Sequence, residues 1–159
     1  MKNRPGKFSL GLDYGTESSR AVLVDISTGE QAGCVVSAYR NGVIDRVLPV
    51  KKKVRLEPDW ALQDPSDYLD ILKKIPSLLK QSGVKADDVI GIGIDFTSCT
   101  ILPVKSDGTP LCNISAFRDN PHSWVKLWKH HAAQPEADRI NQVAGERNEK
   151  FLKRYGGKV

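Results

Sequence analysis

The sequence predicts an α/β fold, because strand-like and helix-like apolar patterns alternate along the chain. Residues 8–13 alternate apolar and polar side chains and residues 20–26 contain a short apolar run, as strands of a sheet do. Residues 64–83 repeat apolar side chains at helical spacing, and residues 90–96 return to alternation. Strands on both sides of a helix in the sequence are typical of α/β domains.

The first three strands are predicted to form two hairpins. We expect them at about 8–13, 20–26 and 31–39, with Ser27–Glu30 as the turn between the last two. The stretch that continues to Trp60 has no regular pattern and could carry one short additional strand.

A helix is predicted over residues 64–83, with signals at both ends. Asp64 can cap its N-terminus, Pro65 fits its first position, and Gly83 ends it. Pro76 lacks the backbone N–H that a regular helix uses, at a cost of roughly 3 kcal/mol, so we expect a kink or a restart there. The apolar stripe consists of Tyr68, Leu72, Ile75 and Leu79.

The strand over residues 90–96 is predicted to be a buried central strand. Gly91 and Gly93 leave room for close backbone packing on one face. The other face carries large apolar side chains, namely Ile90, Ile92, Ile94 and Phe96.

Two more helices are expected after this strand. Asn120 can cap the first of them, Pro121 fits its first position, and Pro135 ends it. A weaker helix follows at about residues 136–147. The inner stripe of the first would consist of Trp124, Leu127, Trp128 and His131.

The loop of the first hairpin, Tyr14–Ser19, has the composition of an anion site. Gly15 allows backbone N–H groups to converge, while Thr16, Ser18 and Ser19 add hydroxyl donors. Hairpins of this composition are also common without a ligand, so an ordinary turn is the alternative.

Two charged residues flank this loop and suit a phosphate chain with its metal. Asp13 could orient water on a phosphate-bound Mg²⁺, a cation that prefers oxygen ligands and keeps several waters. Arg20 could reach the phosphates as a fixed positive charge. The hairpin is therefore a candidate phosphate site.

A second candidate site follows the strand over residues 90–96. In open α/β sheets ligands gather beyond the carboxyl ends of strands, which is where Thr97–Thr100 falls. Short polar side chains at this place suit the hydroxyl groups of a small ligand. The alternative is that these residues only form a turn.

Asp13–Arg20 resembles the first phosphate motif of the actin-like ATPase superfamily, and specifically of its FGGY carbohydrate kinases. The resemblance extends over nearly all residues from Phe8 onward. Together with three further segments, this motif is similar to the FGGY kinases that act on L-ribulose, and the last of these segments is the most specific. The further segments that carry it are Trp60–Pro65 (WALQDP), Gly91–Thr100 (GIGIDFTSCT) and Asp119–Ala133 (DNPHSWVKLWKHHAA).

The resemblance implies an actin-like ATPase, or ribonuclease H-like, lobe with a mixed sheet flanked by helices. Such kinases have two lobes with the active site between them and run to several hundred residues. We therefore expect residues 1–7 to be an N-terminal extension and residues 8–159 to be an incomplete first lobe, with the second lobe absent.

The resemblance also implies the reaction, which is ATP-dependent phosphorylation of L-ribulose to L-ribulose 5-phosphate in L-arabinose catabolism. The implied cofactors are ATP and Mg²⁺, with Asp13 acting on the metal through water. The implied phosphate-binding residues are Gly15, Thr16, Ser18, Ser19 and Arg20. The implied sugar-binding residues are Thr97, Ser98, Phe117 and Asp119.

The catalytic proton acceptor and most of the adenine pocket belong to the second lobe in FGGY kinases. We therefore assign no catalytic residue to this chain and expect it to be inactive alone. Related glycerol kinases carry an Arg-Glu pair where Ser98 and Cys99 stand, which makes glycerol a poor candidate substrate. Two alternatives remain, a non-catalytic sugar-binding or regulatory module and an actin-like nucleotide switch, and the switch does not predict the sugar contacts.

The resemblance implies a ketopentose and ATP as partners, with a homo-oligomer possible, and composition argues against other partners. The chain has 159 residues and a formal charge of +5, but its basic cluster Lys51–Arg55 lacks interleaved aromatics and is expected to be solvated surface, so we predict no nucleic-acid partner. No apolar run reaches the about 18 residues of a membrane span. Unpaired Cys34, Cys99 and Cys112 favour a reducing compartment, so we predict the cytoplasm.

Other side chains are assigned structural roles. His130 and His131 are adjacent, and neighbouring helical residues point about 100° apart, which excludes a shared metal from one helix face. We expect His131 to pack beside Trp128. The tryptophans, Trp60, Trp124 and Trp128, are expected to be core or interface aromatics.

Overall fold

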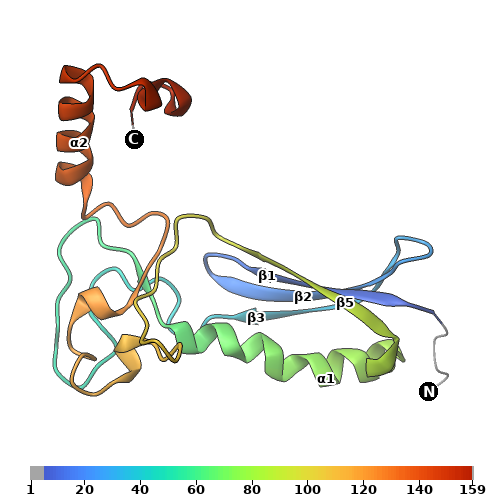
Figure 1. The fold of residues 1–159 in the computed structure, drawn as a ribbon. Helices are drawn as coiled ribbons and strands as arrows, with labels where there is room; N and C mark the ends of the chain where they lie inside the picture. Colours follow the sequence, from blue (N-terminus) through green and yellow to red (C-terminus); the bar gives the residue numbers. More distant parts are fainter. Residues whose placement is uncertain (1–5, 159) are drawn as a thin grey trace.

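The computed structural model describes residues 6–158, in which a four-stranded sheet forms one half of the body (Figure 1). The strand order is β3-β2-β1-β5. β1 pairs antiparallel with β2 and parallel with β5, and β2 pairs antiparallel with β3, so the sheet is mixed as predicted. The bounds are β1 Phe8–Tyr14, β2 Ser18–Asp25, β3 Gln31–Ala38 and β5 Val89–Phe96. Residues 1–5 of the predicted extension lie outside the described residues.

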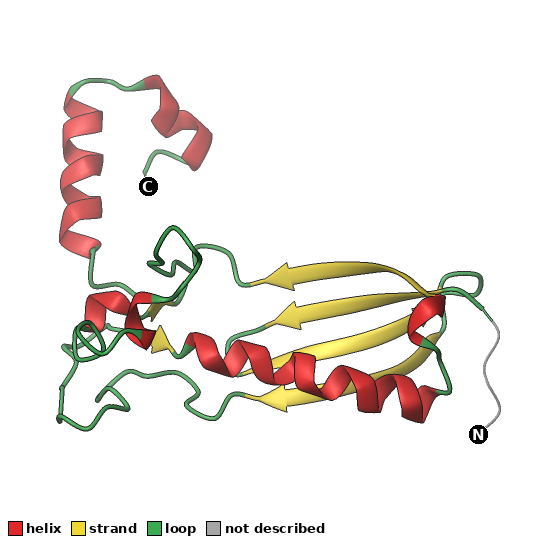
Figure 2. Ribbon diagram, turned by 60° about the horizontal axis from the view of Figure 1, so that its bottom comes forward, coloured by secondary structure: helices red, strands yellow, loops and turns green. Residues whose placement is uncertain are grey.

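One long helix covers part of one sheet face (Figure 2). This is α1, Asp70–Ser82, which follows the 3₁₀ helix η1, Pro65–Leu69, and contacts β3 and β2. The alternating side chains of the first two strands supply the sheet side of the core, as their pattern predicted. The buried members are Phe8, Leu10, Leu12, Ala21, Leu23, Ile71, Leu78 and Val84.

A second core lies beyond the end of the sheet where β1 and β5 terminate. Its backbone is mostly irregular, apart from the short pair β4, Leu62–Gln63, and β6, Val125–Lys126. The strand β4 lies just after the stretch in which the sequence allowed a short addition, and that stretch itself contains only isolated bridges, at Ile44, Val47 and Arg55. The buried members are Ile44, Leu48, Leu62, Cys112 and Trp124. The hairpin tip and the turn after β5 lie at this end of the sheet, next to the second core.

The remaining elements are short, except for one helix that stands away from the body (Figure 1). This helix is α2, Gln134–Glu146, and it confirms the third predicted helix, although Pro135 lies in its first turn instead of ending an earlier one. The 3₁₀ turns are η2 Ala86–Asp88, η3 Leu111–Asn113, η4 Pro121–Ser123 and η5 Lys150–Tyr155.

The predicted start and end of the first helix are confirmed, but its interruption lies elsewhere. The Asp64 side chain accepts a hydrogen bond from the Ser66 N–H, and Gly83 ends α1 in a left-handed conformation. The segment changes from 3₁₀ to α geometry at Asp70, and α1 then continues through Pro76 without a restart. Pro76 is exposed, so water can serve a helix carbonyl that has lost its N–H partner.

The helix predicted to start at Asn120 is wrong. The Asn120 side chain does cap the His122 N–H, but only the single turn η4 follows. Val125 and Lys126 instead pair with β4, and Lys126 also exchanges backbone hydrogen bonds with Ile101. Tertiary pairing therefore gives this segment the backbone partners that a helix would have given it.

The prediction that residues 90–96 form a buried central strand is also wrong for the described chain. β5 is an edge strand, and α1 lies over β2 and β3 instead of over it. A methyl group added at Gly91 or Gly93 would meet no neighbouring atom within 4 Å. The exposed fractions of the apolar side chains are 57% for Ile90, 63% for Ile92, 62% for Ile94 and 68% for Phe96.

The surface of the described chain includes the basic cluster. Lys51, Lys52 and Lys53 are exposed in a loop, as predicted for a solvated basic cluster. Among the described residues, no helix combines the length and the apolar character that crossing a membrane requires.

Gly33 of β3 allows the close approach of α1, and we predict that Gly33→Ala destabilises the fold. A methyl group there would meet the Ser82 Oγ atom and would lie 3.1 Å from Leu78 Cδ1. We expect the free energy of unfolding, measured with urea, to fall by about 1–3 kcal/mol. Gly91→Ala is the matched control in an open strand position and should change it by less than about 1 kcal/mol. Equal effects of both substitutions would contradict this packing argument.

Candidate phosphate and sugar site

Strand register places the charged residues of the hairpin on the sheet face opposite to α1. Asp13 pairs with Arg20 across β1 and β2, and with Asp95 across β1 and β5. The Arg20 Nη1 atom lies 3.0 Å from Asp13 Oδ2. These three residues, with Gly11 and Gly93, line part of a groove of about 540 Å³. The two predicted charged residues are therefore adjacent and reachable from solvent.

The hairpin tip is shorter than the predicted loop, because Tyr14 and Ser19 still pair within the sheet. Only three residues, 15–17, lie between the strands. The Gly15 N–H donates to the Ser18 carbonyl at 3.0 Å and closes the turn.

Distant segments hold the carbonyl side of this tip. Gln63 Nε2 donates to the Thr16 carbonyl at 2.7 Å, and the Tyr39 N–H donates to the Glu17 carbonyl at 3.0 Å. Trp128 Nε1 donates to Thr16 Oγ1 at 3.1 Å. Within residues 6–158, none of the hydrogen bonds is donated by the backbone N–H of Thr16 or Glu17. The tip thus keeps two backbone donors available for an anion.

The structure contradicts a phosphate contact from Ser19. Its side chain is fully buried and lies on the α1 side of the sheet, because Arg20 next to it takes the open side. Neither Ser19 Oγ nor the Tyr39 hydroxyl makes a well-formed hydrogen bond among the described residues, although the two side chains lie close enough to interact. Burial, with a smaller effect of Asp13, raises the pKa of Tyr39 to about 12, so this hydroxyl stays protonated. Gly15, Thr16, Ser18 and Arg20 remain accessible to different degrees.

The polar turn after β5 lies beside the hairpin. The Thr97 N–H donates to the Tyr14 carbonyl at 3.3 Å, which continues the pairing of β5 with β1. The Thr97 and Thr100 hydroxyls are 2.8 Å apart, and Cys99 has a left-handed φ of 58°. A pocket of about 300 Å³ opens here, lined by Tyr14, Tyr68, Ile94, Phe96, Thr97, Thr100, Leu102 and Val125. Two hydroxyls in a mostly apolar and aromatic pocket suit one small polyol.

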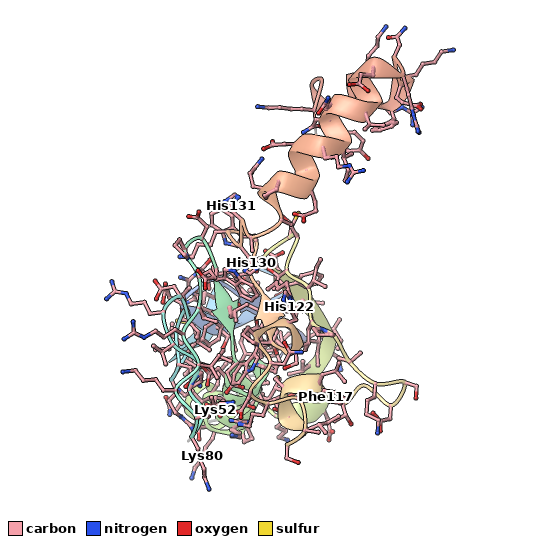
Figure 3. All side chains as sticks on the ribbon, turned by 90° about the vertical axis from the view of Figure 1, so that its left-hand side faces the viewer. Lys52, Lys80, Phe117, His122, His130 and His131 are labelled. Carbon is pink, nitrogen blue, oxygen red and sulfur yellow. The ribbon has the colours of Figure 1, made fainter. Side chains whose placement is uncertain are left out.

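The other predicted sugar residues do not line this pocket. Ser98, Phe117 and Asp119 are exposed. Ser123 Oγ donates to the Phe117 carbonyl at 2.7 Å, and Trp124 Nε1 donates to the Arg118 carbonyl at 3.0 Å. These two buried side chains therefore fix the backbone of the loop that carries Phe117. Figure 3 shows Phe117 at one side of the body, away from α2.

Sequence reasoning missed the part that Tyr14 and Tyr68 play in the pocket. Their ring centroids are 5.9 Å apart in an edge-to-face contact. Tyr68 donates to Gln63 Oε1 at 2.6 Å and thereby links the pocket to the hairpin tip. The Trp60–Pro65 motif could have indicated this link. Asp64 of that motif caps the helix, whereas Gln63 has no such role and was therefore open to a contact elsewhere.

The histidines do not form a metal site, and no cluster of three metal-binding side chains occurs among the described residues. His130 packs edge-on against Trp60 at 4.8 Å, and its Nδ1 atom accepts the Ala61 N–H at 3.1 Å. His131 is exposed (Figure 3), and the ring contacts among the described residues include none between His131 and Trp128, where packing was expected. Trp124 is buried as expected, whereas Trp128 is 53% exposed over the hairpin tip.

Comparison with curated proteins finds close relatives for this chain. It is 56% identical over 154 residues to a ribulokinase of Halalkalibacterium halodurans, 60% over 143 residues to one of Bacillus licheniformis, and 48% over 154 residues to one of Mycolicibacterium smegmatis. The first match covers 96% of this chain and 27% of the relative, and the second 89% and 26%. The chain therefore spans about a quarter of the length of these relatives. No family model matches the sequence.

Solved structures of sugar kinases share the fold. A xylulose kinase from Brucella ovis superposes with a TM-score of 0.65 at 20% identity, covering 89% of this chain and 25% of that chain. A gluconate kinase from Lactobacillus acidophilus gives a TM-score of 0.59 at 20% identity, covering 89% and 23%. This likeness confirms the predicted fold class, part of an actin-like ATPase fold.

His130 gives a testable pH dependence of stability. Burial first, and then the nearby Lys126, His122 and His131, lower the pKa of His130 below 6.5. Its contribution is therefore fully present above about pH 6.5 and is lost as the pH falls through the folded-state pKa, because protonation removes the acceptor for the Ala61 N–H.

We expect the free energy of unfolding to fall between pH 7 and pH 5, and His130→Asn to reduce the size of that fall. The measurement is urea unfolding at each pH. His131→Asn is the comparison variant, because His131 only adds the smallest of the effects on the pKa of His130, and it should reduce the slope less than His130→Asn does. An unchanged slope in His130→Asn would contradict the role given to this contact.

Proposed function

We propose, from the homology of this chain to the N-terminal part of ribulokinases in the FGGY carbohydrate kinase family, that it forms part of an ATP-dependent L-ribulose kinase. The observation that carries the proposal is the adjacency of two elements. A hairpin with available backbone donors and an Asp13–Arg20 pair lies directly beside a pocket with paired threonine hydroxyls. The reaction is transfer of the γ-phosphoryl group to the terminal 5-hydroxyl of the sugar, giving L-ribulose 5-phosphate.

The phosphate half of the reaction belongs to the hairpin. The tip that begins at Gly15 binds phosphate oxygens through the backbone N–H groups of Thr16 and Glu17 and the hydroxyls of Thr16 and Ser18, and Arg20 neutralises part of their charge. Thr16 Oγ1 accepts from Trp128, so its own proton stays available to donate.

The residues present also fit Mg²⁺. The Asp13 carboxylate is partly exposed at the groove and offers oxygen to a hard cation through water, with Asp95 next to it in the parallel register. Mg²⁺ bound to ATP would neutralise charge on the transferred group. Asp13 orients that hydrated ion, and Arg20 limits the repulsion between the carboxylate and the phosphates.

The sugar half belongs to the turn after β5 and to the loop that carries Phe117. Thr97 supplies a hydroxyl within the pocket. Ser98 in the same turn, and Phe117 and Asp119 in a separate exposed loop, add sugar contacts from outside the described pocket lining. Positioning of both reactants, with charge neutralisation, is the contribution of this chain to catalysis. We place the proton acceptor and the adenine pocket outside residues 1–159.

Sugar-dependent release of ADP tests the proposal. The full-length protein that contains this chain should release ADP with L-ribulose faster than with D-ribulose or ribitol, whereas the 159-residue chain alone should show no turnover. Sugar binding without ADP release by the full-length protein would favour a non-catalytic sugar-binding or regulatory module. Turnover by the chain alone at the full-length rate would overturn the division of the site.

We predict that Asp13→Ala in the full-length protein lowers kcat by about 10²-fold or more and leaves sugar affinity nearly unchanged. Its ion pair with Arg20 is largely solvated, so the loss of folding free energy should stay below about 1 kcal/mol. Asp45→Ala, which also breaks a solvated pair with an arginine, is the control and should keep full activity. Full activity of Asp13→Ala with Mg·ATP would refute the phosphate assignment.

Ser98→Leu is predicted to act on the sugar side. A bulky apolar side chain at the pocket rim should raise the KM for L-ribulose about tenfold and the KM for ATP less than twofold, by steady-state kinetics. Ser106→Leu makes the same change in the exposed turn 105–108 and should alter neither constant. The reverse order of the two KM changes would mean that the halves of the site are exchanged.

A further inference from the structure

We propose that Gln63 is a positioning residue for the phosphate hairpin, which it holds so that the Glu17 N–H of the tip faces the nucleotide phosphates. This inference rests on the proposed kinase function and goes beyond it. Gln63 belongs to the Trp60–Pro65 segment, to which the phosphate and sugar assignments give no task.

The geometry leaves this side chain one orientation. Gln63 is 1% exposed, and both ends of its amide are used, Nε2 on the Thr16 carbonyl at 2.7 Å and Oε1 on the Tyr68 hydroxyl at 2.6 Å. A carbonyl oxygen only accepts, so the amide NH₂ must face Thr16 and Oε1 must face Tyr68. A buried amide with both ends satisfied is costly to reorient, because either end would then be left without a partner.

The tyrosine that completes this arrangement is held as a donor. Tyr68 packs edge-on against Tyr14 and Tyr39, with ring centroids 5.9 and 5.5 Å away. Burial, with Tyr39 and the nearby carboxylates of Asp67 and Asp64, raises the pKa of Tyr68 well above its usual value. The hydroxyl therefore keeps its proton and continues to donate to Gln63.

Holding the Thr16 carbonyl determines where the next N–H points. The carbonyl of Thr16 and the N–H of Glu17 belong to one trans peptide unit and point in opposite directions. Gln63 binds the carbonyl from the side of the second core, so the Glu17 N–H faces away from that core. Tyr39 holds the following carbonyl, that of Glu17, in the same manner. Two successive peptide units of the tip are thus oriented before a ligand arrives.

The position of Gln63 in the chain shows that this is a tertiary device and not a property of the hairpin. Gln63 and Thr16 are 47 residues apart, and Trp128, the other side chain on Thr16, is 112 residues away. The hairpin alone closes with a single Gly15–Ser18 hydrogen bond. Preorganised donors stabilise charge without reorganisation at the moment of reaction.

The test uses Gln63→Glu in the full-length protein. The substitution keeps the shape and the acceptor for Tyr68, but it replaces the donor on Thr16 by an oxygen. We expect the KM for Mg·ATP and the Kd for Mg·ADP, measured by calorimetry without sugar, to rise about tenfold. The KM for L-ribulose should change less than twofold, which a general loss of folding would not produce. Gln81→Glu makes the same change at an exposed position of α1 and, as control, should leave the Kd for Mg·ADP unchanged.

If Gln63→Glu does not fold, Gln63→Met tests the positioning role instead, because methionine has a similar length and introduces no buried charge. It should weaken Mg·ADP binding to the same extent. If the variant raised both KM values equally, or left the Kd for Mg·ADP unchanged, the positioning role would be refuted. Turnover by the wild-type protein would in that case still support the kinase function. If the wild-type protein bound Mg·ADP but phosphorylated no sugar, the kinase function would be refuted. Weaker binding of Mg·ADP by Gln63→Glu would then still support the positioning role.

Discussion

The pairing of β1 with both of its neighbours is the constraint on which the candidate site depends. β1 is the only described strand with partners of both directions, antiparallel β2 and parallel β5. The antiparallel partner creates the hairpin tip, and the parallel partner brings the Thr97–Thr100 turn to the same end of the sheet. Because side chains alternate along a strand, this register also decides which hairpin residues face the groove.

The hairpin tip and the second core depend on each other. Gln63, in the short pair β4–β6, and Trp128, just after that pair, bind the tip. His130 in turn holds the backbone next to β4 through Ala61. The irregular half of the molecule is therefore more than a covering layer, since it supplies the contacts that orient the peptide units of the loop.

Local signals in the sequence were enough for the elements whose partners lie nearby. Alternation located β1 to β3, and the cap at Asp64 and the glycine at position 83 located the ends of the first helical segment. The cap at Asn120 was equally real, yet a cap only satisfies the first N–H groups and does not decide whether a helix continues. That outcome depended on the pairing of Val125–Lys126 with β4, more than 60 residues earlier.

The same limit applies to the site. Asp13 and Arg20 could be named because their residue types alone indicate phosphate chemistry, but the burial of Ser19 follows from a register that composition does not encode. Likewise, the apolar face of β5 predicted burial, but this strand lies exposed at the edge of the described sheet, because burial depends on which residues cover a strand. The contact of Gln63 with Thr16 joins two segments whose proximity no local pattern expresses.

The uncovered β5 strand has a consequence for the colloidal behaviour of the chain. An apolar edge strand with unpaired backbone groups is a template for strand addition, and residues 89–94 carry no proline and no charged side chain that would discourage it. The formal charge of +5 is then the main force that keeps copies apart. Salt at 0.1 M limits that repulsion to about 10 Å, so added salt should bring the edges together instead of solubilising the chain.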